Sequence, residues 1–291
     1  MNTYSIETAV IPVAGVGSRM LPATWSIEKC MLPVYTGGKT RLLVDYMVDE
    51  CAKAGIKRVI FVTTERGKKQ LRDYFEKIDA GLAERYEHLG KGNVVVTEQA
   101  RRDTYGITYE YVVQPPDGYG TAIPPLLARP LLQGEKRFFL MGGDDFVYHE
   151  DPNISELSLA IKTWSQAATD HIIMGNPVPR TVASRYGVLF ADNLENLSEW
   201  VEKPTLEQLP DRPVITANIS RYGFSDCIWD YLDQEARAVR NGEHYITYPV
   251  LNALAAGQTF RIHPVQGTYL DGGTAEGLIE ASQYIIKHSR L

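Results

Sequence analysis

The stretch that decides the fold is Val10–Thr24, which reads Val-Ile-Pro-Val-Ala-Gly-Val-Gly-Ser-Arg-Met-Leu-Pro-Ala-Thr. Its beginning belongs to an apolar run, Thr8–Ala14, that predicts a buried strand ended by a glycine turn. Gly15 and Gly17 carry no Cβ that would keep a ligand away from the backbone, and they expose N–H groups that can face an anion. The stretch therefore predicts an anion-binding loop at the end of a strand.

Two cations follow the glycines at short range. Arg19 offers a forked, permanently charged group that suits phosphate, and Lys29 adds a compact second charge. A tight turn alone would explain the glycines but neither cation. The order of strand, bare backbone, arginine and lysine therefore indicates a site for a polyphosphate.

Two familiar glycine motifs fit this chain less well. A dinucleotide-binding fingerprint needs a third glycine where Met20 stands, and Pro22 interrupts the helix that should follow. Gly37–Thr40 ends like a P-loop, but the first glycine of that motif would fall on Pro33. Tyr35–Lys39 is better interpreted as a turn before the next helix.

Length, composition and charge limit the classes of protein that are possible. The 291 residues are 44% hydrophobic and 23% charged, which is ordinary for a globular protein and allows one α/β core. The net charge of −6, without a basic tract, argues against a nucleic-acid partner. No apolar run is long enough for a membrane span, and three widely spaced cysteines (Cys30, Cys51 and Cys227) suggest a reducing cytoplasm.

The first half of the chain alternates strand and helix patterns, which predicts βαβ units and a mainly parallel sheet. The strands are expected at Thr8–Ala14, Arg58–Thr64, Ile107–Gln114 and Arg137–Gly143. Helices are expected at Leu42–Ala54, Lys68–His88 and Thr121–Leu132.

The second half has shorter strands separated by Pro- and Asn-rich turns, which predicts a smaller antiparallel lobe. The strands are expected at His171–Val178, Tyr186–Ala191, Leu197–Lys203 and Ile215–Phe224, and helices at Cys227–Gln234, Thr247–Ala256 and Ala275–Lys287. The predicted fold is α/β and Rossmann-like, with a mixed, mainly parallel central sheet flanked by helices. Residues 1–291 are expected to form a single domain, divided at about residue 145.

Polar side chains stand at the ends of strands at three places in the chain. Gln114 has an amide that matches the imide edge of a pyrimidine, and Gly118 and Gly120 beside it allow close backbone approach. Asp144 follows a buried strand, where open α/β sheets bind ligands, and Asp271 follows a later strand. Two such carboxylates suit Mg²⁺. Two alternatives remain open: Gln114 could simply be the polar end of a strand, and Asp271 could cap a turn.

The complete set of motifs resembles the sugar-nucleotide pyrophosphorylases, and within them most closely the bacterial UTP–glucose-1-phosphate uridylyltransferases. The resemblance begins with Gly-x-Gly-Ser-Arg-x-Leu-Pro-x-Thr at 15–24, then a lysine and Leu-Pro. It continues through nearly the whole chain in the same order, at Gln114, Asp144, Tyr186–Val188, Glu202–Pro204 and Asp271.

The resemblance implies a role for each matching residue. The nucleotide is expected at Ala14, Gly15, Gly17, Arg19, Gln114 and either Gly118 or Gly120. The sugar phosphate is expected at Gly143, Tyr186, Gly187, Glu202 and Lys203, and the catalytic magnesium at Asp144 and Asp271. Residues 1–145 would then form a nucleotide-binding half, and residues 146–291 a sugar-binding half with the C-terminal helices.

The implied reaction forms UDP-glucose and pyrophosphate from UTP and glucose 1-phosphate. Arg19, Lys29 and Lys203 are the expected catalytic cations, acting on the leaving pyrophosphate, the α-phosphate and the attacking phosphate respectively. Another base or sugar (dTTP, for example) is an alternative, and so is a regulatory homologue that binds sugar nucleotides with little activity. The resemblance also implies a homodimer or homotetramer with small-molecule substrates.

Several positions depart from the uridylyltransferase pattern. Trp25 and Glu28 replace its lysine and proline, and Cys30 replaces its glutamate. Cys30 lies beside Lys29, and we expect a packed residue there rather than a reactive thiol. These changes leave the expected phosphate chemistry intact.

Overall fold

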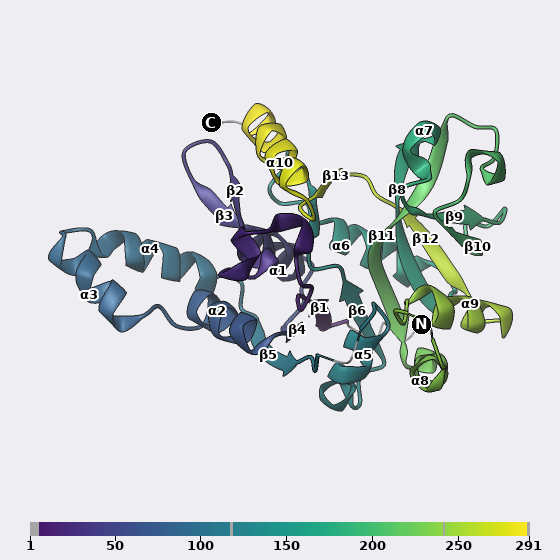
Figure 1. Ribbon diagram of the computed structural model, residues 1–291, viewed down its shortest axis with the longest axis horizontal. Coiled ribbons are helices and arrows are strands. Elements are labelled where there is room, and N and C mark those ends of the chain that lie inside the picture. Colours follow the sequence, from purple (N-terminus) through teal and green to yellow (C-terminus); the bar gives the residue numbers. More distant parts are fainter. Residues whose placement is uncertain (1–5, 117–118, 241, 290–291) are drawn as a thin grey trace.

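The computed structural model describes residues 6–116, 119–240 and 242–289, and it is built around a nine-stranded mixed sheet (Figure 1). The strands of this sheet are β1 (Thr8–Pro12), β4 (Arg58–Thr63), β5 (Thr108–Val113), β6 (Arg137–Met141), β8 (His171–Pro179), β9 (Gly187–Ala191), β10 (Leu197–Glu202), β11 (Val214–Ser225) and β12 (Phe260–Pro264). Two further pairs are β2 (Pro33–Tyr35) with β3 (Thr40–Leu42), and β7 (Asp145–Tyr148) with β13 (Thr268–Asp271). The helices are α1 (Leu43–Lys53), α2 (Glu65–Phe75), α3 (Ala80–His88), α4 (Gly92–Asp103), α5 (Ile123–Ala128), α6 (Glu156–Gln166), α7 (Arg180–Ala183), α8 (Trp229–Arg237), α9 (Thr247–Ala255) and α10 (Ala275–His288).

The parallel part of the sheet places a crevice beside β1. The main path of the sheet is β10-β9-β11-β6-β1-β4-β5, in which β1 pairs in parallel with β4 on one side and with β6 on the other. The chain thus passes from β1 to β4 on one side of β1 and later returns with β6 on the other side. Open α/β sheets bind ligands at the carboxyl ends of the strands around such a switch point.

Helices cover both faces of the sheet, which explains the uninterrupted apolar run of β1. Ala9 and Ile11 belong to the core under α1, α2, α6 and α10, whereas Val10 belongs to the core under α5, α8 and α9. All three side chains are fully buried. The predicted buried strand is confirmed, although it ends at Pro12 rather than at Ala14.

The antiparallel strands of the second half extend the main sheet. β11 pairs antiparallel with β6, β8 and β9, and β10 pairs antiparallel with β9. The predicted α/β fold with a mainly parallel centre and an antiparallel lobe is therefore confirmed, and one continuous sheet joins the two parts. The expected turn at Tyr35–Lys39 joins β2 to β3, with Gly37 and Gly38 at φ angles of 74° and 99°.

Some elements were not predicted from the sequence. The polar stretch Lys68–His88 is two helices, α2 and α3, because the chain breaks before Asp79, whose side chain accepts from the N–H of Leu82 and caps α3. Helices α4 and α6 and strands β7 and β12 fell in segments without a predicted element. In α4 the reason is plain, because none of its residues, all of which the structure describes, is buried.

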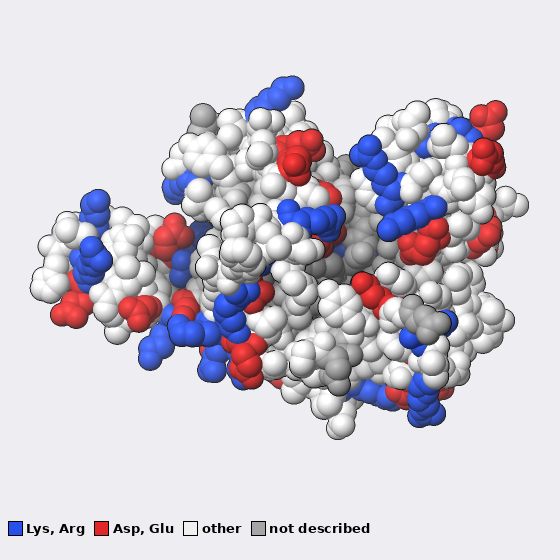
Figure 2. All heavy atoms as spheres, in the orientation of Figure 1, with Lys and Arg blue, Asp and Glu red and all other residues white. Residues whose placement is uncertain are grey.

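Helices α3 and α4 form an arm that projects from one end of the molecule (Figure 1). None of the residues of α3 or α4, which the structure describes in full, is buried, and Leu82, Leu89, Val94 and Val96 are between 45% and 69% exposed. The arm carries acidic and basic side chains together (Figure 2). Its surface is therefore apolar in places and of mixed charge.

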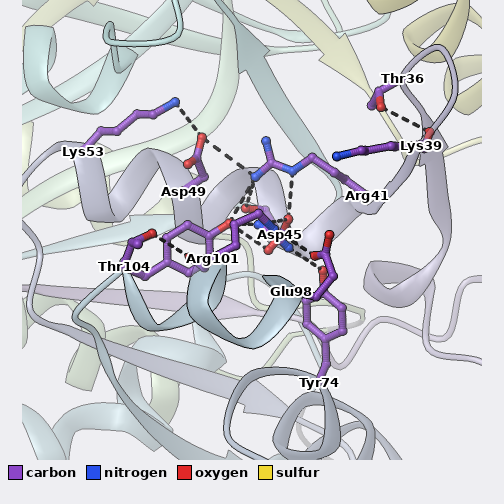
Figure 3. A network of polar contacts seen from close by, with 11 residues as sticks. Thr36, Lys39, Arg41, Asp45, Asp49, Lys53, Tyr74, Glu98, Arg101 and Thr104 are labelled. Carbon is purple, nitrogen blue, oxygen red and sulfur yellow. Dashed lines mark hydrogen bonds and ion pairs between the residues drawn. The ribbon is translucent and has the colours of Figure 1, made fainter. Parts of the chain in front are cut away.

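A buried carboxylate fixes the base of the arm to α1. Asp45 is fully buried and accepts from Arg41 Nε at 2.8 Å, from Arg101 Nη1 at 3.1 Å and from the Tyr105 hydroxyl at 2.9 Å (Figure 3). Arg101 lies in the last turn of α4, so this cluster ties the second helix of the arm to the body. Only charge-assisted hydrogen bonds of this kind make a buried carboxylate tolerable.

Among the helices of the described residues, none has the length and apolar character needed to cross a membrane.

The side chain of His171 at the start of β8 is held in its neutral form. Burial lowers the pKa of His171 from 6.5 to about 4. Its Nδ1 accepts from the N–H of Ser225 at 3.1 Å, and its Nε2 lies 2.7 Å from Gln258 Oε1, so both ring nitrogens are engaged. The imidazole also stacks on Phe260 at a centroid distance of 4.4 Å.

We expect this histidine to make the fold acid-sensitive. Above pH 6.5 the imidazole is neutral in both states, and its effect on stability is constant. As the pH falls from 6.5 towards 4, the unfolded state takes up a proton first, so the free energy of unfolding should fall by about 3 kcal/mol. Urea unfolding at several pH values should show this slope, and His171→Gln should remove it. Parallel pH profiles for the two proteins would contradict the assignment.

Candidate functional site

The predicted anion-binding loop depends on Gly17. Its φ is +65°, and a Cβ there would lie 2.8 Å from Cγ2 of Thr24. The Thr24 hydroxyl donates to the Gly17 carbonyl at 2.9 Å, which closes the loop on itself. A Cβ at Gly15, by contrast, would meet open space among the described residues. Gly17 therefore shapes the turn, while Gly15 leaves the backbone accessible.

An ion pair that the sequence did not reveal fastens this loop to α2. Glu28 is 3% exposed, and its Oε1 accepts from Arg66 Nε at 2.9 Å and from the Thr64 hydroxyl at 2.6 Å. Arg66 also donates to the carbonyls of Trp25 at 2.6 Å and Thr24 at 3.1 Å. One guanidinium thus holds three points of the loop immediately before Lys29.

Gly143 brings the carboxylate that follows β6 close to the loop after β1. A Cβ at Gly143 would lie 2.0 Å from the Pro12 carbonyl oxygen, so only glycine allows β6 to end this close to β1. The following residue, Asp144, accepts from Lys29 Nζ at 2.5 Å. The Lys29 ammonium group therefore places a positive charge directly beside the Asp144 carboxylate.

Three predicted residues from distant parts of the chain meet around Gly273. A Cβ on Gly273 would lie 2.8 Å from Asp271 Oδ1, 3.1 Å from Asp144 Oδ2 and 3.2 Å from Arg19 Nη2. Asp271 Oδ1 also accepts from the Gly273 N–H at 2.7 Å, so the expected turn cap is present as well. Two carboxylates and a guanidinium therefore converge on one small volume.

The donor set fits a hard divalent cation that takes most of its ligands from elsewhere. Among the described residues, no three His, Cys, Asp or Glu side chains are grouped so that they could hold a metal ion. Mg²⁺ commonly binds through one or two carboxylates and completes its octahedron with water and substrate phosphates. Asp144 and Asp271 meet that requirement.

A buried charge cluster lies directly beneath these carboxylates. Arg221 is fully buried and pairs with both Asp145 and Glu50. The Tyr269 hydroxyl donates to Asp145 Oδ2 at 3.1 Å. Burial raises the pKa of Asp145 to about 6, and Arg221 opposes that rise. Because Asp145 pairs with Asp271 across β7 and β13, the cluster supports both predicted metal ligands.

Two adjoining cavities open around Asp144. The first, which we call the loop cavity, has a volume of about 240 Å³ and is lined by Ala14, Gly15, Lys29, Gln114 and Gly120, among others. The second, the β10 cavity, measures about 320 Å³ and is lined by Arg19, Tyr186, Gly187, Glu202, Lys203 and Asp271, among others. Pro12, Thr121, Gly142, Asp144 and Ser220 line both. The surface is hollowed in its centre, with acidic and basic side chains on the rim (Figure 2).

Lys203 reaches the β10 cavity from a strained backbone. Its φ is +45°, a left-handed conformation that costs a non-glycine residue roughly 1–2 kcal/mol. Its N–H donates to the Tyr186 carbonyl at 3.1 Å, which holds the two predicted sugar-side residues together. Glu202 is the last residue of β10, so the strained residue Lys203 directly follows the end of this strand.

Known proteins are similar to this chain over almost its whole length. The family model described as nucleotidyl transferase matches residues 8–288. The chain belongs to this nucleotidyl transferase family. It is 30% identical to the UTP–glucose-1-phosphate uridylyltransferase of Haemophilus influenzae, covering 97% of this chain and 94% of the relative. The Pseudomonas aeruginosa protein of the same name is also 30% identical, with 96% and 95% covered.

Solved structures agree with the sequence relatives. A UDP-glucose pyrophosphorylase from Acinetobacter baumannii superimposes with a TM-score of 0.82 at 26% identity, covering 99% of this chain and 96% of that one. A UDP-glucose pyrophosphorylase complexed with UDP-glucose has a TM-score of 0.75 at 26% identity, covering 97% and 99%. The predicted resemblance to this enzyme family is confirmed.

Most residues expected from the family lie in one of the two cavities. Gly143 was expected on the sugar side, but it lines the loop cavity. Gly17 shapes the loop without lining either cavity. Gly118 lies outside the described residues. Gly120 has a φ of +119°, and a Cβ there would lie 2.3 Å from the His244 carbonyl oxygen, so packing against that segment requires the glycine.

Several residues that line the cavities were not predicted to be site residues. The loop cavity includes Glu243, and the β10 cavity includes Arg185, Trp200, Asn218, Tyr245 and Thr247. Cys30, predicted to be a packed residue, is 1% exposed, and burial raises the pKa of its thiol to about 12. A neutral buried thiol is chemically inert, as expected.

The ion pair between Glu28 and Arg66 should stabilise the fold measurably. Arg66→Gln leaves a buried carboxylate without its cation, so we expect the free energy of unfolding to fall by about 1 kcal/mol. This value is reduced from that of a fully buried pair because Arg66 is 42% exposed. Urea unfolding measures the change. Lys69→Gln, which breaks an exposed pair with Asp73 on the same helix, is the matched control and should have no measurable effect. Equal effects for the two variants would contradict the role of the pair.

Proposed function

We propose that this chain forms UDP-glucose and pyrophosphate from UTP and glucose 1-phosphate. The observation that carries the proposal is the position of Asp144, which borders both cavities and contacts Lys29. A carboxylate at such a junction can hold a cation between two phosphorylated substrates. The relatives and structural neighbours that bear this activity in their names support the choice of reaction.

The chain's own residues would act mainly by placing charge. An oxygen of the sugar phosphate attacks the α-phosphorus of UTP in line, and the bond to the pyrophosphate oxygen breaks. Arg19 holds the leaving pyrophosphate, Lys29 the α-phosphate and Lys203 the attacking phosphate. Fixed donors of this kind stabilise charge without reorganisation at the moment of reaction.

Asp144 and Asp271 would hold Mg²⁺. When bound, the ion would neutralise charge on the phosphate oxygens. Gln114 and Gly120 at the loop cavity would receive the uracil, and Tyr186 with Glu202 at the β10 cavity would receive the glucose.

An activity assay can distinguish this reaction from two alternatives. The same chemistry with another base or sugar, such as dTTP, uses the same phosphate contacts. A regulatory homologue would bind sugar nucleotides without turnover. Six charged residues expected in the active site are retained, which argues against that alternative: Arg19, Lys29, Asp144, Glu202, Lys203 and Asp271.

A pyrophosphate-release assay across nucleotides and sugar 1-phosphates tests the proposal. UTP should clearly surpass ATP and GTP, because an amide that matches a uracil edge leaves unmet polar groups with a purine. The thymine methyl group does not change that edge, so dTTP should retain activity. Gln114→Ala should erode the preference for pyrimidines more than the maximal rate. Equal use of ATP and UTP would refute the base assignment, and no release with any pair would refute the activity.

The metal assignment has its own test. Asp144→Asn removes a charge that the metal needs, so we expect turnover to fall at least 100-fold, within the range of catalytic electrostatic effects. EDTA should abolish wild-type activity, and added Mg²⁺ should restore it. Asp211→Asn, at an exposed position, is the control and should keep full activity. A fully active Asp144→Asn enzyme would exclude this carboxylate as a metal ligand.

We further propose that the protein is a homodimer or homotetramer, with the α3–α4 arm as a contact between copies. A pair of short helices without buried residues is marginal in water, so the arm gains from being covered. Its mixture of acidic and basic side chains suits contact with an identical surface better than with a nucleic acid or an anionic membrane (Figure 2).

Light scattering after gel filtration tests the oligomer. The wild type should elute as a dimer or tetramer, and the double variant Leu89→Glu/Val96→Glu should be monomeric, because it places charge on exposed apolar positions of the arm. Leu194→Glu, at a position 70% exposed outside the arm, is the matched control. A monomeric wild type, or an unchanged mass for the double variant, would refute this contact.

We propose the cytoplasm as the location of the protein. Cys30, Cys51 and Cys227 are all free thiols, two of them buried, which suits a reducing compartment. The substrates are small molecules, and neither a nucleic acid nor a membrane is needed for the reaction.

A further inference from the structure

One short segment in the second half of the chain borders both cavities. Residues 243–247, which we call the linking segment, lead into α9. Glu243 lines the loop cavity, whereas Tyr245, Ile246 and Thr247 line the β10 cavity. The linking segment therefore meets the cavity proposed for UTP on one side and the cavity proposed for glucose 1-phosphate on the other.

The linking segment is hydrogen-bonded to the loop that carries Gly120. The His244 N–H donates to the Tyr119 carbonyl at 3.1 Å, and the His244 carbonyl accepts from the Ala122 N–H at 2.8 Å. Gly120 lies between these two bonds, and a Cβ there would lie 2.4 Å from the His244 nitrogen. The position of the Gly120 loop therefore depends on the position of His244.

The same segment holds the carboxylate on the sugar side. The Thr247 hydroxyl donates to Glu202 Oε1 at 2.7 Å, and Thr247 is 5% exposed, so this contact is largely shielded from water. One residue earlier, the Ile246 N–H donates at 2.9 Å to the hydroxyl of Thr121, which borders both cavities. Two hydrogen bonds from adjacent residues thus connect Glu202 to the Gly120 loop.

A side-chain cluster outside the cavities fixes the linking segment. Glu235 on α8 is 1% exposed, and its Oε1 lies 2.9 Å from His244 Nδ1. Arg240 donates to the same carboxylate from Nε at 2.9 Å and from Nη2 at 2.5 Å. Because a carboxylate paired with arginine can only accept, His244 Nδ1 carries the proton and donates. Among the described residues that line the two cavities, neither Glu235 nor His244 is included, so the pair can act on a substrate only through other residues.

This cluster fixes the direction of the His244 ring as well as its distance from α8. Hydrogen bonds to a charged group are about twice as strong as those between neutral groups. If the imidazole turned away, a carboxylate that is almost completely buried would lose one of its donors, which is costly. The linking segment is therefore held in one position before a substrate binds.

We propose that His244, held in place by Glu235, is a positioning residue for both substrates. Its backbone fixes the Gly120 loop on the nucleotide side. Through the rest of the linking segment it fixes Thr247, and with it the Glu202 carboxylate, on the sugar side. This inference rests on the proposed function, because it assumes that UTP occupies the loop cavity and glucose 1-phosphate the β10 cavity.

Steady-state kinetics with UTP and glucose 1-phosphate test the inference. His244→Ala removes the ring that binds Glu235 but changes no residue that lines either cavity. KM should rise roughly 3- to 10-fold for each substrate, while kcat should stay within about twofold of the wild type, because no cation that acts on the phosphates is lost. His244→Asn places an amide nitrogen where Nδ1 was, and it should bring both KM values back to within about twofold of the wild type.

Two further variants separate positioning from a general loss of stability. Glu235→Ala should raise both KM values as His244→Ala does, and the double variant should show no additional rise, because the two residues act as one pair. Asp233→Asn is the matched control, since it breaks an ion pair of 2.7 Å with Arg129 on the same helix. It should leave both KM values unchanged. All rates are measured below the thermal unfolding range of each variant.

The outcomes distinguish this inference from the proposed function. If His244→Ala raises KM for one substrate only, changes kcat alone or changes neither constant, the inference is overturned. Equal rises in KM for Asp233→Asn would also overturn it, because the effect would not be specific to the pair. If neither His244→Ala nor Glu235→Ala folds, the pair is structural and the inference fails. If the wild type releases no pyrophosphate with these two substrates, the proposed function itself fails.

Discussion

The ends of β1 and β6 approach each other more closely than any side chain allows, and the site depends on this contact. A Cβ on Gly143 would lie only 2.0 Å from the carbonyl oxygen of Pro12. Because the strands meet here, Asp144 lies within hydrogen-bonding distance of Lys29, which the loop after β1 presents. A larger residue at 143 would separate the carboxylate from the lysine and divide the two cavities that now share a border.

Concentrating acidic groups at this border creates a repulsion that the fold has to offset. Asp144, Asp145 and Asp271 lie close together, and like charges in a partly buried site raise one another's free energy. Lys29 and Arg19 reduce the charge from the solvent side, and Arg221 reduces it from within the core. A fully buried arginine is costly to desolvate, and it is tolerated here because two carboxylates and a backbone carbonyl receive its donors. The carboxylates at this border and the charged groups in the core beneath them are thus one electrostatic unit.

An element could be predicted from the sequence where its burial or its chemistry leaves a recognisable pattern of residues. Strand β1 is buried on both faces, so its apolar run was visible, and its glycines and cations carry chemistry that few other patterns share. Helix α4 has no buried residues, so it lacks the apolar stripe that would predict it. The partner of Glu28 was invisible because Arg66 belongs to another helix, 38 residues away.

The departure at Glu28 changes how the loop is supported rather than what it presents. A proline at this position, as in the uridylyltransferase pattern, would stiffen the loop by fixing one φ angle. Glu28 instead binds the loop to Arg66 on α2, and Gln70 on the same helix accepts from the Glu28 N–H at 3.0 Å. Helix α2 packs against β4 and β5, and Gln114 follows β5 directly. Lys29 and Gln114 are therefore supported by the same helix, which couples the position of the loop after β1 to the end of the strand that lines the loop cavity.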